Sequence, residues 1–369
     1  MGTNPQAPLK GRGATFNPGN RFRRDTREAV DDGWTPPPSE GKVESEDQEL
    51  PPLKTTVTIQ RSRTIIARND SPDIPFTQSI NPYQGCEHGC VYCYARPTHA
   101  YLDLSPGLDF ETKLFAKPNA AALLTAELAK PGYVCDAIAM GTNTDPYQPI
   151  EREWKITRQI LEVLSACEHP VSIVTKSALV ERDIDLLAPM AAKNLARVYV
   201  SITTLDRDLA RTLEPRAAAP HRRLAAVKAL SDAGIPVGVM TAPIIPQLTD
   251  KDLEAILDAA SANGARYAGW TLVRLPHEVK DLFRDWLAQH YPLRAEHVMS
   301  MIQQMRGGRD NDPQFGSRMR GQGLFADLIS RRFDIASQRL GLNRDRAPMD
   351  TSRFTPPRTE SQRAQLTLF

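Results

Sequence analysis

The chain has 369 residues, of which 46 are basic and 44 acidic, and 41% of it is hydrophobic. This length allows one large domain with appendages, and the near balance of charge gives no argument for a nucleic-acid or membrane partner. No apolar run approaches the roughly 18 residues that span a bilayer, and the N-terminal stretch lacks the apolar core of a secretory signal, so a cytoplasmic protein is expected.

Residues 1–60 are predicted to form a mostly disordered N-terminal arm. Three prolines, Pro36 to Pro38, precede an acidic, Ser-rich stretch, and apolar periodicity is weak throughout. A basic stretch that opens with Gly-Arg-Gly lies before them, from Gly11 to Arg24. This stretch is either a solvated tail or a short arm that docks on the domain or on a polyanion.

Residues 61–292 alternate short β-branched stretches with amphipathic helical stretches. The predicted strands are 77–81, 136–141, 171–176, 197–203, 236–245 and 267–274. The predicted helices are 119–129, 151–166, 182–193, 221–233, 250–263 and 279–289, with Asn119 and Thr249 as N-caps and Gly234 and Gly264 near helix ends. Six strand–helix units imply right-handed parallel crossovers, yet they are too few for an eight-stranded barrel. We therefore expect an α/β fold, an open partial TIM-type (β/α)6 barrel, with its chemistry at the C-terminal ends of the strands.

Three of the five cysteines lie in one loop after the first predicted strand, in a C-x3-C-x2-C spacing. They are Cys86, Cys90 and Cys93. The odd number of cysteines and the close spacing favour metal ligation over a disulfide framework. Three thiolates on one loop can ligate three irons of a [4Fe–4S] cluster and leave the fourth iron without a protein ligand. A zinc site completed by His88 and a purely structural cluster remain alternatives. The other two, Cys135 and Cys167, are expected to be ordinary core residues.

This spacing, with Tyr92 directly before the third cysteine, resembles the radical S-adenosylmethionine (radical SAM) superfamily over roughly residues 77–290. The resemblance implies that the open iron binds the amino and carboxylate groups of S-adenosylmethionine. One electron from the cluster then breaks a carbon–sulfur bond, which gives methionine and a 5′-deoxyadenosyl radical. The resemblance also implies an electron donor of the flavodoxin or ferredoxin type.

The ends of the other predicted strands supply candidate cofactor ligands. By the resemblance, the segment from Gly141 to Glu151 grips the methionyl ammonium, although an Asx turn that caps the next helix is an alternative. A cation at Lys176 and a hydroxyl at Ser201 could hold the cofactor carboxylate. Glu214 and Arg216 belong to the cofactor cradle or form a loop salt bridge. The residues expected to bind the cofactor are Tyr92, Gly141, Thr142, Asn143, Asp145, Lys176, Ser201 and Arg216.

The Thr-Asn-Thr-Asp-Pro-Tyr-Gln and Leu-Glu-Pro-Arg segments resemble the branch of the superfamily that contains spore photoproduct lyase, which reverses a thymine–thymine adduct in DNA. They also resemble bacterial radical proteins of unknown substrate that carry Gly-Arg-Gly near the N-terminus. Photoproduct lyases have a hydrogen-donating cysteine in the loop after the second strand, whereas this chain reads Met140-Gly-Thr-Asn143 there. This departure counts against true photoproduct lyase activity. Tyr94 and Tyr147 are the candidate hydrogen donors.

Residues 293–340 are expected to form an arginine-rich helical extension, in which residues 314–321 form a loop that covers the open side of the barrel or contacts phosphates. A solvated extension is the alternative. Residues 341–369 are expected to be a flexible tail. The tail ends in Gln365-Leu-Thr-Leu-Phe369, which is similar to the peptide by which bacterial repair proteins dock on the sliding clamp, unless it folds back on the barrel.

Together these features predict a monomeric radical SAM enzyme with one [4Fe–4S] cluster that acts on a nucleic acid, with lyase-like chemistry on a DNA lesion. One alternative is radical modification of a protein or small molecule. Another is a non-catalytic iron–sulfur adaptor at the sliding clamp.

Overall fold

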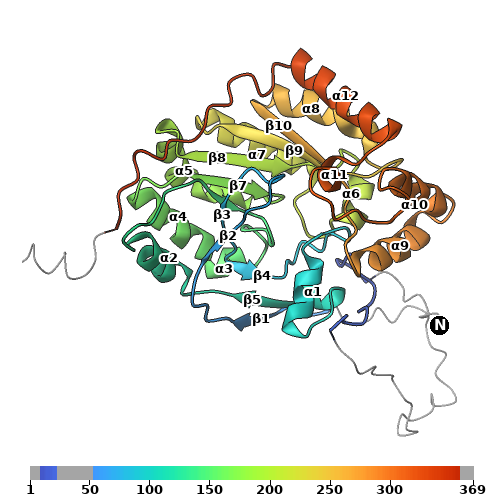
Figure 1. Ribbon diagram of the computed structural model, residues 1–369, viewed down its shortest axis with the longest axis horizontal. Coiled ribbons are helices and arrows are strands. Elements are labelled where there is room, and N and C mark those ends of the chain that lie inside the picture. The colour runs from blue at the N-terminus through green and yellow to red at the C-terminus, as the bar shows by residue number, and fades with distance from the viewer. Residues whose placement is uncertain (1–8, 23–52, 358–369) are drawn as a thin grey trace, which may run out of the picture.

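The computed structural model describes residues 9–22 and 53–357 of the chain. A seven-stranded sheet forms its centre, with helices around it (Figure 1). In spatial order its strands are β10 (Tyr267–Leu272), β9 (Val237–Ile244), β8 (Ala196–Ser201), β7 (Val171–Thr175), β6 (Ile138–Met140), β3 (Gln78–Ile80) and β2 (Ile66–Arg68). The first six are parallel, and β2 pairs antiparallel with β3 at one edge. Since β10 and β2 are the two edges of this sheet, the barrel is open, as predicted.

All six predicted parallel strands are present, each within a few residues of its expected bounds. They read as apolar runs because helices cover one face and the barrel interior covers the other; every residue of β8 is buried. The helices of the described chain are α1 (Leu108–Thr112), α2 (Ala120–Leu128), α3 (Glu151–Trp154), α4 (Ile156–Ala166), α5 (Ile184–Ala192), α6 (Arg207–Leu213), α7 (Pro220–Asp232), α8 (Leu253–Ala262), α9 (Val279–His290), α10 (Ala295–Gln304), α11 (Ser317–Arg320) and α12 (Leu324–Arg339). The described residues also form three short 3-10 helices, at Arg96–Leu102, Ala178–Asp183 and Asp250–Asp252.

The expected helix over 151–166 is two helices, because Lys155 takes a left-handed conformation with φ of 51° between α3 and α4. The break turns Glu151 inward, where its buried carboxylate accepts hydrogen bonds from the Thr157 main chain at 3.1 Å and from Arg182 at 2.7 Å. The amphipathic pattern of the sequence did not indicate that the side chain of Glu151 would be buried.

Two further local predictions hold only in part. Asn119 and Thr249 occupy N-cap positions, but neither side chain caps its helix, and the Thr249 hydroxyl accepts from the Ile245 main chain instead. The segment 314–321 is not a loop throughout, since one helical turn, α11, lies within it. The glycine stops at Gly234 and Gly264 are present, each with positive φ.

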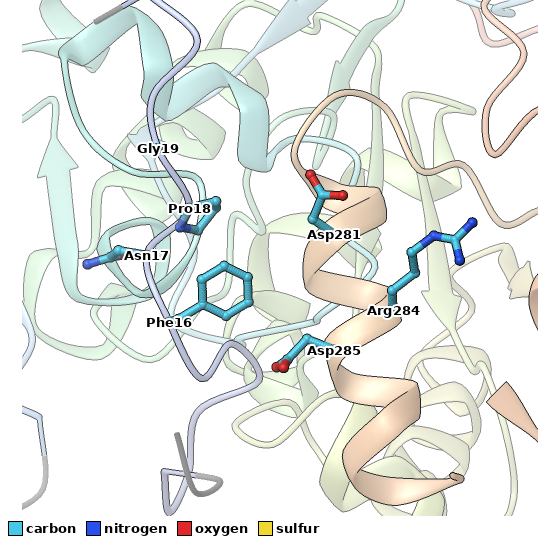
Figure 2. Close-up of a pocket in the computed structure, with 7 residues that line it drawn as sticks. All are labelled: Phe16, Asn17, Pro18, Gly19, Asp281, Arg284 and Asp285. Atoms are coloured by element: carbon cyan, nitrogen blue, oxygen red, sulfur yellow. The ribbon is translucent and has the colours of Figure 1, made fainter. Parts of the chain in front are cut away.

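Part of the N-terminal arm is packed into the fold. Residues 9–22 run from the small sheet of β1 (Thr56–Ile59), β5 (Lys113–Ala116) and β4 (Tyr83–Gln84) to helix α9. Figure 2 shows residues 16–19 beside the face of α9 that carries Asp281, Arg284 and Asp285, across a pocket of about 400 Å³. For these residues the docked arm replaces the expectation of a disordered tail. Main-chain contacts hold it together with side-chain pairs such as Thr15 with Asp285 and Arg21 with Glu278, and neither kind of contact leaves a periodicity in the sequence.

The expected flexible tail is also partly packed. Asn343 exchanges hydrogen bonds of 3.0 Å with both main-chain groups of Ala268 in β10, and Thr355 donates to the Cys167 carbonyl at 2.9 Å. Residues 341–357 thus lie along the N-terminal ends of the strands. Gln365 to Phe369 lie outside the described residues, so the clamp-binding peptide stays a prediction. None of the described helices has the length and hydropathy needed to cross a membrane.

His169 is buried in this same region and makes stability depend on pH. Its ring lies 5.2 Å from the ring of Phe354, and its Nε2 pairs with the Tyr133 hydroxyl at 2.8 Å. Burial lowers the pKa of His169 from 6.5 to about 4. Between these values the unfolded chain binds the extra proton and the folded chain does not, so the free energy of unfolding falls as the pH falls.

Lowering the pH from 7 to 5 should therefore cost the wild type about 2 kcal/mol through this residue. His169→Phe fills the same space between the two aromatic rings without a titrating group, so it should lose that part of the pH dependence. Urea unfolding of both proteins at pH 7 and pH 5 measures the difference. Equal losses in the two proteins would contradict the assignment.

Candidate functional site

The cysteine loop leaves the C-terminal end of β3 and is fastened to the segment that follows β6. The Thr144 hydroxyl and the Gln148 amide both donate to the Gly85 carbonyl, at 2.7 and 3.2 Å. The Gln148 side-chain oxygen also accepts from the Glu87 main chain at 2.9 Å. Both side chains are buried, so the start of the loop is held rigidly against the neighbouring strand end.

A buried arginine supports the loop from beneath. Arg96 is fully buried and donates to the carbonyls of Gly89 at 3.2 Å and Cys90 at 2.9 Å. It also reaches the Pro106 and Gly107 carbonyls and pairs with Glu111 at 2.5 Å. The guanidinium thus holds the main chain around the second cysteine in one conformation.

The N-terminal segment completes this support. The Gly13 and Ala14 main-chain groups donate to the Glu111 carboxylate at 3.0 and 2.9 Å. A Cβ atom on Gly13 would lie 1.8 Å from the Gly89 carbonyl oxygen, so the two main chains are in direct contact. Arg12 donates to the Glu111 carbonyl at 2.9 Å. The Gly-Arg-Gly motif therefore packs against the back of the cysteine loop.

The three thiols lie on one loop and influence one another electrostatically. Burial raises the pKa of Cys86 well above its usual value, raises that of Cys90 to about 12, and raises that of Cys93, and the neighbouring thiols contribute to the first two shifts. Free thiolates are disfavoured here, whereas bound iron would supply the positive charge that keeps them deprotonated. Three thiols that act on one another from one rigid loop fit a cluster in which each thiolate binds a different iron. Within the described ranges, no three His, Cys, Asp or Glu side chains are grouped around a position for one metal ion, which is a different requirement from that of a cluster whose irons each take one thiolate.

Next to these thiols the structure brings together several of the predicted cofactor ligands. The Lys176 ammonium, at the end of β7, donates to the Ser201 hydroxyl at 2.9 Å and lies 5.8 Å from the centre of the Tyr92 ring. Beneath them Glu214 accepts from Thr203 at 2.5 Å and from the Tyr92 hydroxyl, and it pairs with Arg223.

Charge within this group is closely balanced. Burial alone would raise the pKa of Glu214, but the cations Arg223 and Lys176 lower it to about 2. Lys176 is 3.9 Å from a Glu214 oxygen that is already engaged by two hydroxyls. Arg223 pairs with the other Glu214 oxygen, so the Lys176 ammonium is not needed as the sole counter-charge of this carboxylate and can also bind an anionic ligand.

The segment after β6 has two roles. Gly141, with φ of 94°, packs against the Val174 carbonyl oxygen, which would lie 2.0 Å from a Cβ atom at this position. Thr142 and Asn143 follow it, and both donate to the Asn81 side-chain oxygen, at 3.1 and 2.9 Å. These residues stand at the strand ends, near the thiols.

Asp145 is instead occupied by the protein itself. Its carboxylate accepts from the Thr175 hydroxyl at 2.6 Å and from the Lys176 main chain at 2.8 Å, and it lies 3.4 Å from His88. Burial would raise its pKa, but the His88 ring and these hydrogen bonds lower it to about 2. Asp145 therefore fixes the end of β7 and the cysteine loop in relation to each other.

The remaining candidates lie in three different surroundings. Tyr94 is 46% exposed beside Cys93, and its hydroxyl donates to the Thr142 carbonyl. Tyr147 is fully buried and donates to Asp183 at 3.1 Å. Arg216 pairs with Glu87 at 2.9 Å on the outer side of the cysteine loop and lines a pocket of about 430 Å³. The structure thus separates Arg216 from Glu214, which sequence reasoning had considered as its partner.

Sequence reasoning missed the residues that support the site from behind. They are Gly13, Arg96, Glu111, Thr203 and Arg223. Each acts through a contact with a residue distant in the chain, and an isolated arginine or glutamate in a polar stretch does not indicate burial. Only the Gly-Arg-Gly motif and the Leu-Glu-Pro-Arg motif were visible as unusual patterns.

Comparisons with known proteins agree with this arrangement. The sequence pattern of the radical SAM superfamily matches residues 80–260. An uncharacterized protein of Mycobacterium tuberculosis is 40% identical over 221 residues, which are 59% of this chain and 65% of the relative, so the chain spans less than two thirds of that protein. An uncharacterized protein of Methanocaldococcus jannaschii is 30% identical over 219 residues, which cover 59% of this chain and 78% of the relative.

Among solved structures, spore photoproduct lyase complexed with dinucleoside spore photoproduct has a TM-score of 0.55 with this chain. The two are 16% identical, and the match covers 78% of this chain and 80% of that one. At this identity the likeness concerns the fold. It assigns the open barrel to the type found in that enzyme.

Proposed function

Because the chain belongs to the radical SAM superfamily, we propose that it holds a [4Fe–4S] cluster on Cys86, Cys90 and Cys93 and cleaves S-adenosylmethionine reductively. The observation that carries this proposal is the group of three interacting thiols on one rigid loop, with Cys86 and Cys90 buried and Cys93 partly exposed, and with the Lys176 ammonium beside it. When bound there, the cluster would supply the electron that breaks a carbon–sulfur bond, with 5′-deoxyadenosine as the recoverable product.

The chain's own residues would bind and orient the cofactor. Lys176 and Ser201 are close enough to share one carboxylate, and a charge-assisted hydrogen bond from the ammonium would fix its position. Glu214 holds Tyr92 beneath them and keeps the ring directly before the third cysteine in place. Thr142 and Asn143 offer polar groups at the neighbouring strand end for the ammonium of the cofactor.

Tyr94 is the better candidate hydrogen donor of the two tyrosines. Its ring is partly exposed beside Cys93, at the C-terminal ends of the strands. The hydroxyl of Tyr147 is enclosed in the core and engaged by Asp183. A substrate can therefore approach Tyr94 without rearrangement of the fold.

A nucleic acid is the proposed substrate class. The support is the likeness of the fold to spore photoproduct lyase, whose solved complex contains a dinucleoside lesion, and the clamp-like peptide at Gln365–Phe369. The chain has no thiol in the loop after β6, so the reaction would differ from that of the lyase in its hydrogen-transfer step. Radical modification of a protein or small molecule is the competing possibility.

The test is anaerobic. Protein reconstituted with iron and sulfide is reduced with dithionite, given S-adenosylmethionine, and assayed for 5′-deoxyadenosine with and without DNA or RNA. We expect product from the wild type and none from Cys93→Ala, since the variant lacks one of three cluster ligands. Addition of nucleic acid should raise the rate. If wild-type protein with a complete cluster forms no 5′-deoxyadenosine with or without nucleic acid, the enzyme assignment is contradicted. If neither ultraviolet-damaged nor intact DNA changes the rate, the proposal of a DNA substrate loses its support.

A further inference from the structure

Arginine and aromatic side chains lie together at the end of β10 and on α11, which packs on it near the open side of the barrel. Three arginines each lie over an aromatic ring, and we call them the arginine strip. They are Arg274 over Tyr94 at 5.4 Å, Arg318 over Phe315 at 4.7 Å and Arg320 over Trp270 at 4.5 Å, from guanidinium carbon to ring centroid. A guanidinium in this position is attracted by the negative face of the ring. The three arginines come from two segments that pack together, since Arg274 follows β10 and the other two lie in α11.

A fourth arginine builds the strip. Arg306 is buried, and its Nη1 donates to the carbonyls of Ser317 and Arg318, both at 2.9 Å. Its Nη2 donates to the Val273 carbonyl at 2.7 Å, directly before Arg274. One guanidinium thus ties the end of β10 to α11, and the strip is set by main-chain contacts.

The same segment closes the open side of the barrel. Asp73, between β2 and β3, accepts from Arg318 at 2.5 and 2.7 Å and from the Gly316 main chain at 3.0 Å. The contact joins a segment packed on edge strand β10 to the loop that follows edge strand β2. Asp73 also interacts electrostatically with Arg274, but both of its carboxylate oxygens are hydrogen-bonded to Arg318.

Arg274 has no carboxylate partner among the residues that the structure describes. Its Nη1 lies 3.8 Å from the Met319 sulfur, and its Nε is buried without a hydrogen-bond partner. Burial and the neighbouring Arg318 lower the pKa of Arg274. A guanidinium stays charged in proteins, and a desolvated charge is costly unless an opposite charge accompanies it. The missing counter-charge points to an anionic ligand.

That ligand would lie at the mouth of the barrel. Arg274 covers the ring of Tyr94, which follows the third cysteine and reaches the Thr142 carbonyl at the end of β6. An anion bound to Arg274 would therefore lie beside Tyr94, the candidate hydrogen donor. The part of the substrate next to that anion would then lie close to the proposed reaction site.

We propose that Arg274 and Arg320 of the arginine strip bind a phosphodiester of a nucleic-acid substrate, while Arg318 stays paired with Asp73, and that the adjacent base lies against the ring of Tyr94. Guanidinium groups match phosphate oxygens in pairs, and arginines interleaved with aromatic rings are typical of sites for single-stranded or flipped-out nucleotides. This inference rests on the proposed function. It adds the side of the barrel on which the substrate binds and the chemical group of the substrate, a phosphodiester, that the protein binds.

The experiment measures binding separately from catalysis. Reconstituted full-length protein is titrated into a short fluorescein-labelled single-stranded oligodeoxynucleotide, and anisotropy is followed over a series of NaCl concentrations. Arg274→Met should weaken binding about tenfold at fixed salt and lower the salt dependence by about one counterion. Arg320→Met, at an exposed position where folding is not at risk, should shift binding in the same direction. Arg346→Met, an exposed arginine at the opposite, N-terminal ends of the strands, is the matched control and should bind as the wild type does.

Each outcome decides the question. If both strip variants bind like the wild type, or if the wild type does not bind the oligonucleotide while it still forms 5′-deoxyadenosine, the phosphodiester site is rejected and the proposed cleavage stands. If an acidic peptide of equal charge displaces the oligonucleotide with equal affinity, the ligand class is rejected. Strip-dependent binding in a protein that forms no 5′-deoxyadenosine would keep the site and reject the cleavage.

Discussion

Gly13→Ala should prevent the cysteine loop from taking its native position, although the substitution lies more than seventy residues away in the sequence. The added Cβ atom would lie 1.8 Å from the Gly89 carbonyl oxygen, and neither main chain can yield locally. The Gly13 main-chain group donates to Glu111, and Arg96 holds the Gly89 carbonyl from the other side. We expect the free energy of unfolding of the metal-free protein to fall by about 2 kcal/mol, as for overpacked cores. Iron content after reconstitution should fall severalfold.

Gly19→Ala is the matched control, since Gly19 belongs to the same segment and a Cβ atom there meets nothing within 4 Å. It should reconstitute like the wild type. Urea unfolding of the metal-free proteins and iron analysis with the absorption spectrum of the reconstituted proteins provide two separate measurements. Native-like stability and iron content in Gly13→Ala would show that the N-terminal segment does not position the loop.

The regular elements were predictable because of how they are buried. Strands such as β8 are covered on both faces, so an apolar run of the right length is enough to find them. The cysteine loop was predictable for a different reason. Three ligands that bind one cluster from a single loop must lie close together in the sequence, and Cys86 to Cys93 satisfy this within eight residues.

The support of the site could not be predicted in the same way. Arg96 and Glu111 look like surface residues in a polar stretch, yet both are fully buried because each satisfies the other and the surrounding main chain. Gly13 acts through its main-chain N–H group, which every residue type except proline possesses, and the Arg12 guanidinium binds a main-chain carbonyl, so no side-chain pattern announces either contact. These residues are buried because of contacts with residues that are distant in the sequence. A single sequence does not show which distant residues are in contact.

Lys176 and Ser201 lie between these two cases. The order of the strands predicts that their ends meet, because neighbouring parallel strands finish at the same edge of the sheet. The sequence did not predict that Glu214 would neutralise part of the surroundings through Arg223. The positions of Lys176 and Ser201 could therefore be predicted from the order of the strands. The pairing of buried charges around them could be read only from the structure.

Glu214→Gln should destabilise the protein strongly while it preserves the shape of the side chain. Arg223 is 2% exposed and pairs with Glu214, so loss of the carboxylate would leave a buried cation without an opposite charge. Removing one partner of such a pair costs about 3–5 kcal/mol in the free energy of unfolding. The double variant Glu214→Leu with Arg223→Met removes both charges and should recover much of that loss, which urea unfolding at pH 7 measures.

The same pair gives the prediction a pH signature. The pKa of Glu214 is lowered from 4.5 to about 2, so its stabilisation is complete above about pH 4.5 and is lost as the pH falls toward 2. The difference in stability between wild type and Glu214→Gln should therefore shrink across this window. Because Glu214 also binds Tyr92 and lies near Lys176, the variant should lose affinity for S-adenosylmethionine if these residues form the cofactor site. A difference that stays constant across this window would contradict a lowered pKa for Glu214 in the folded protein.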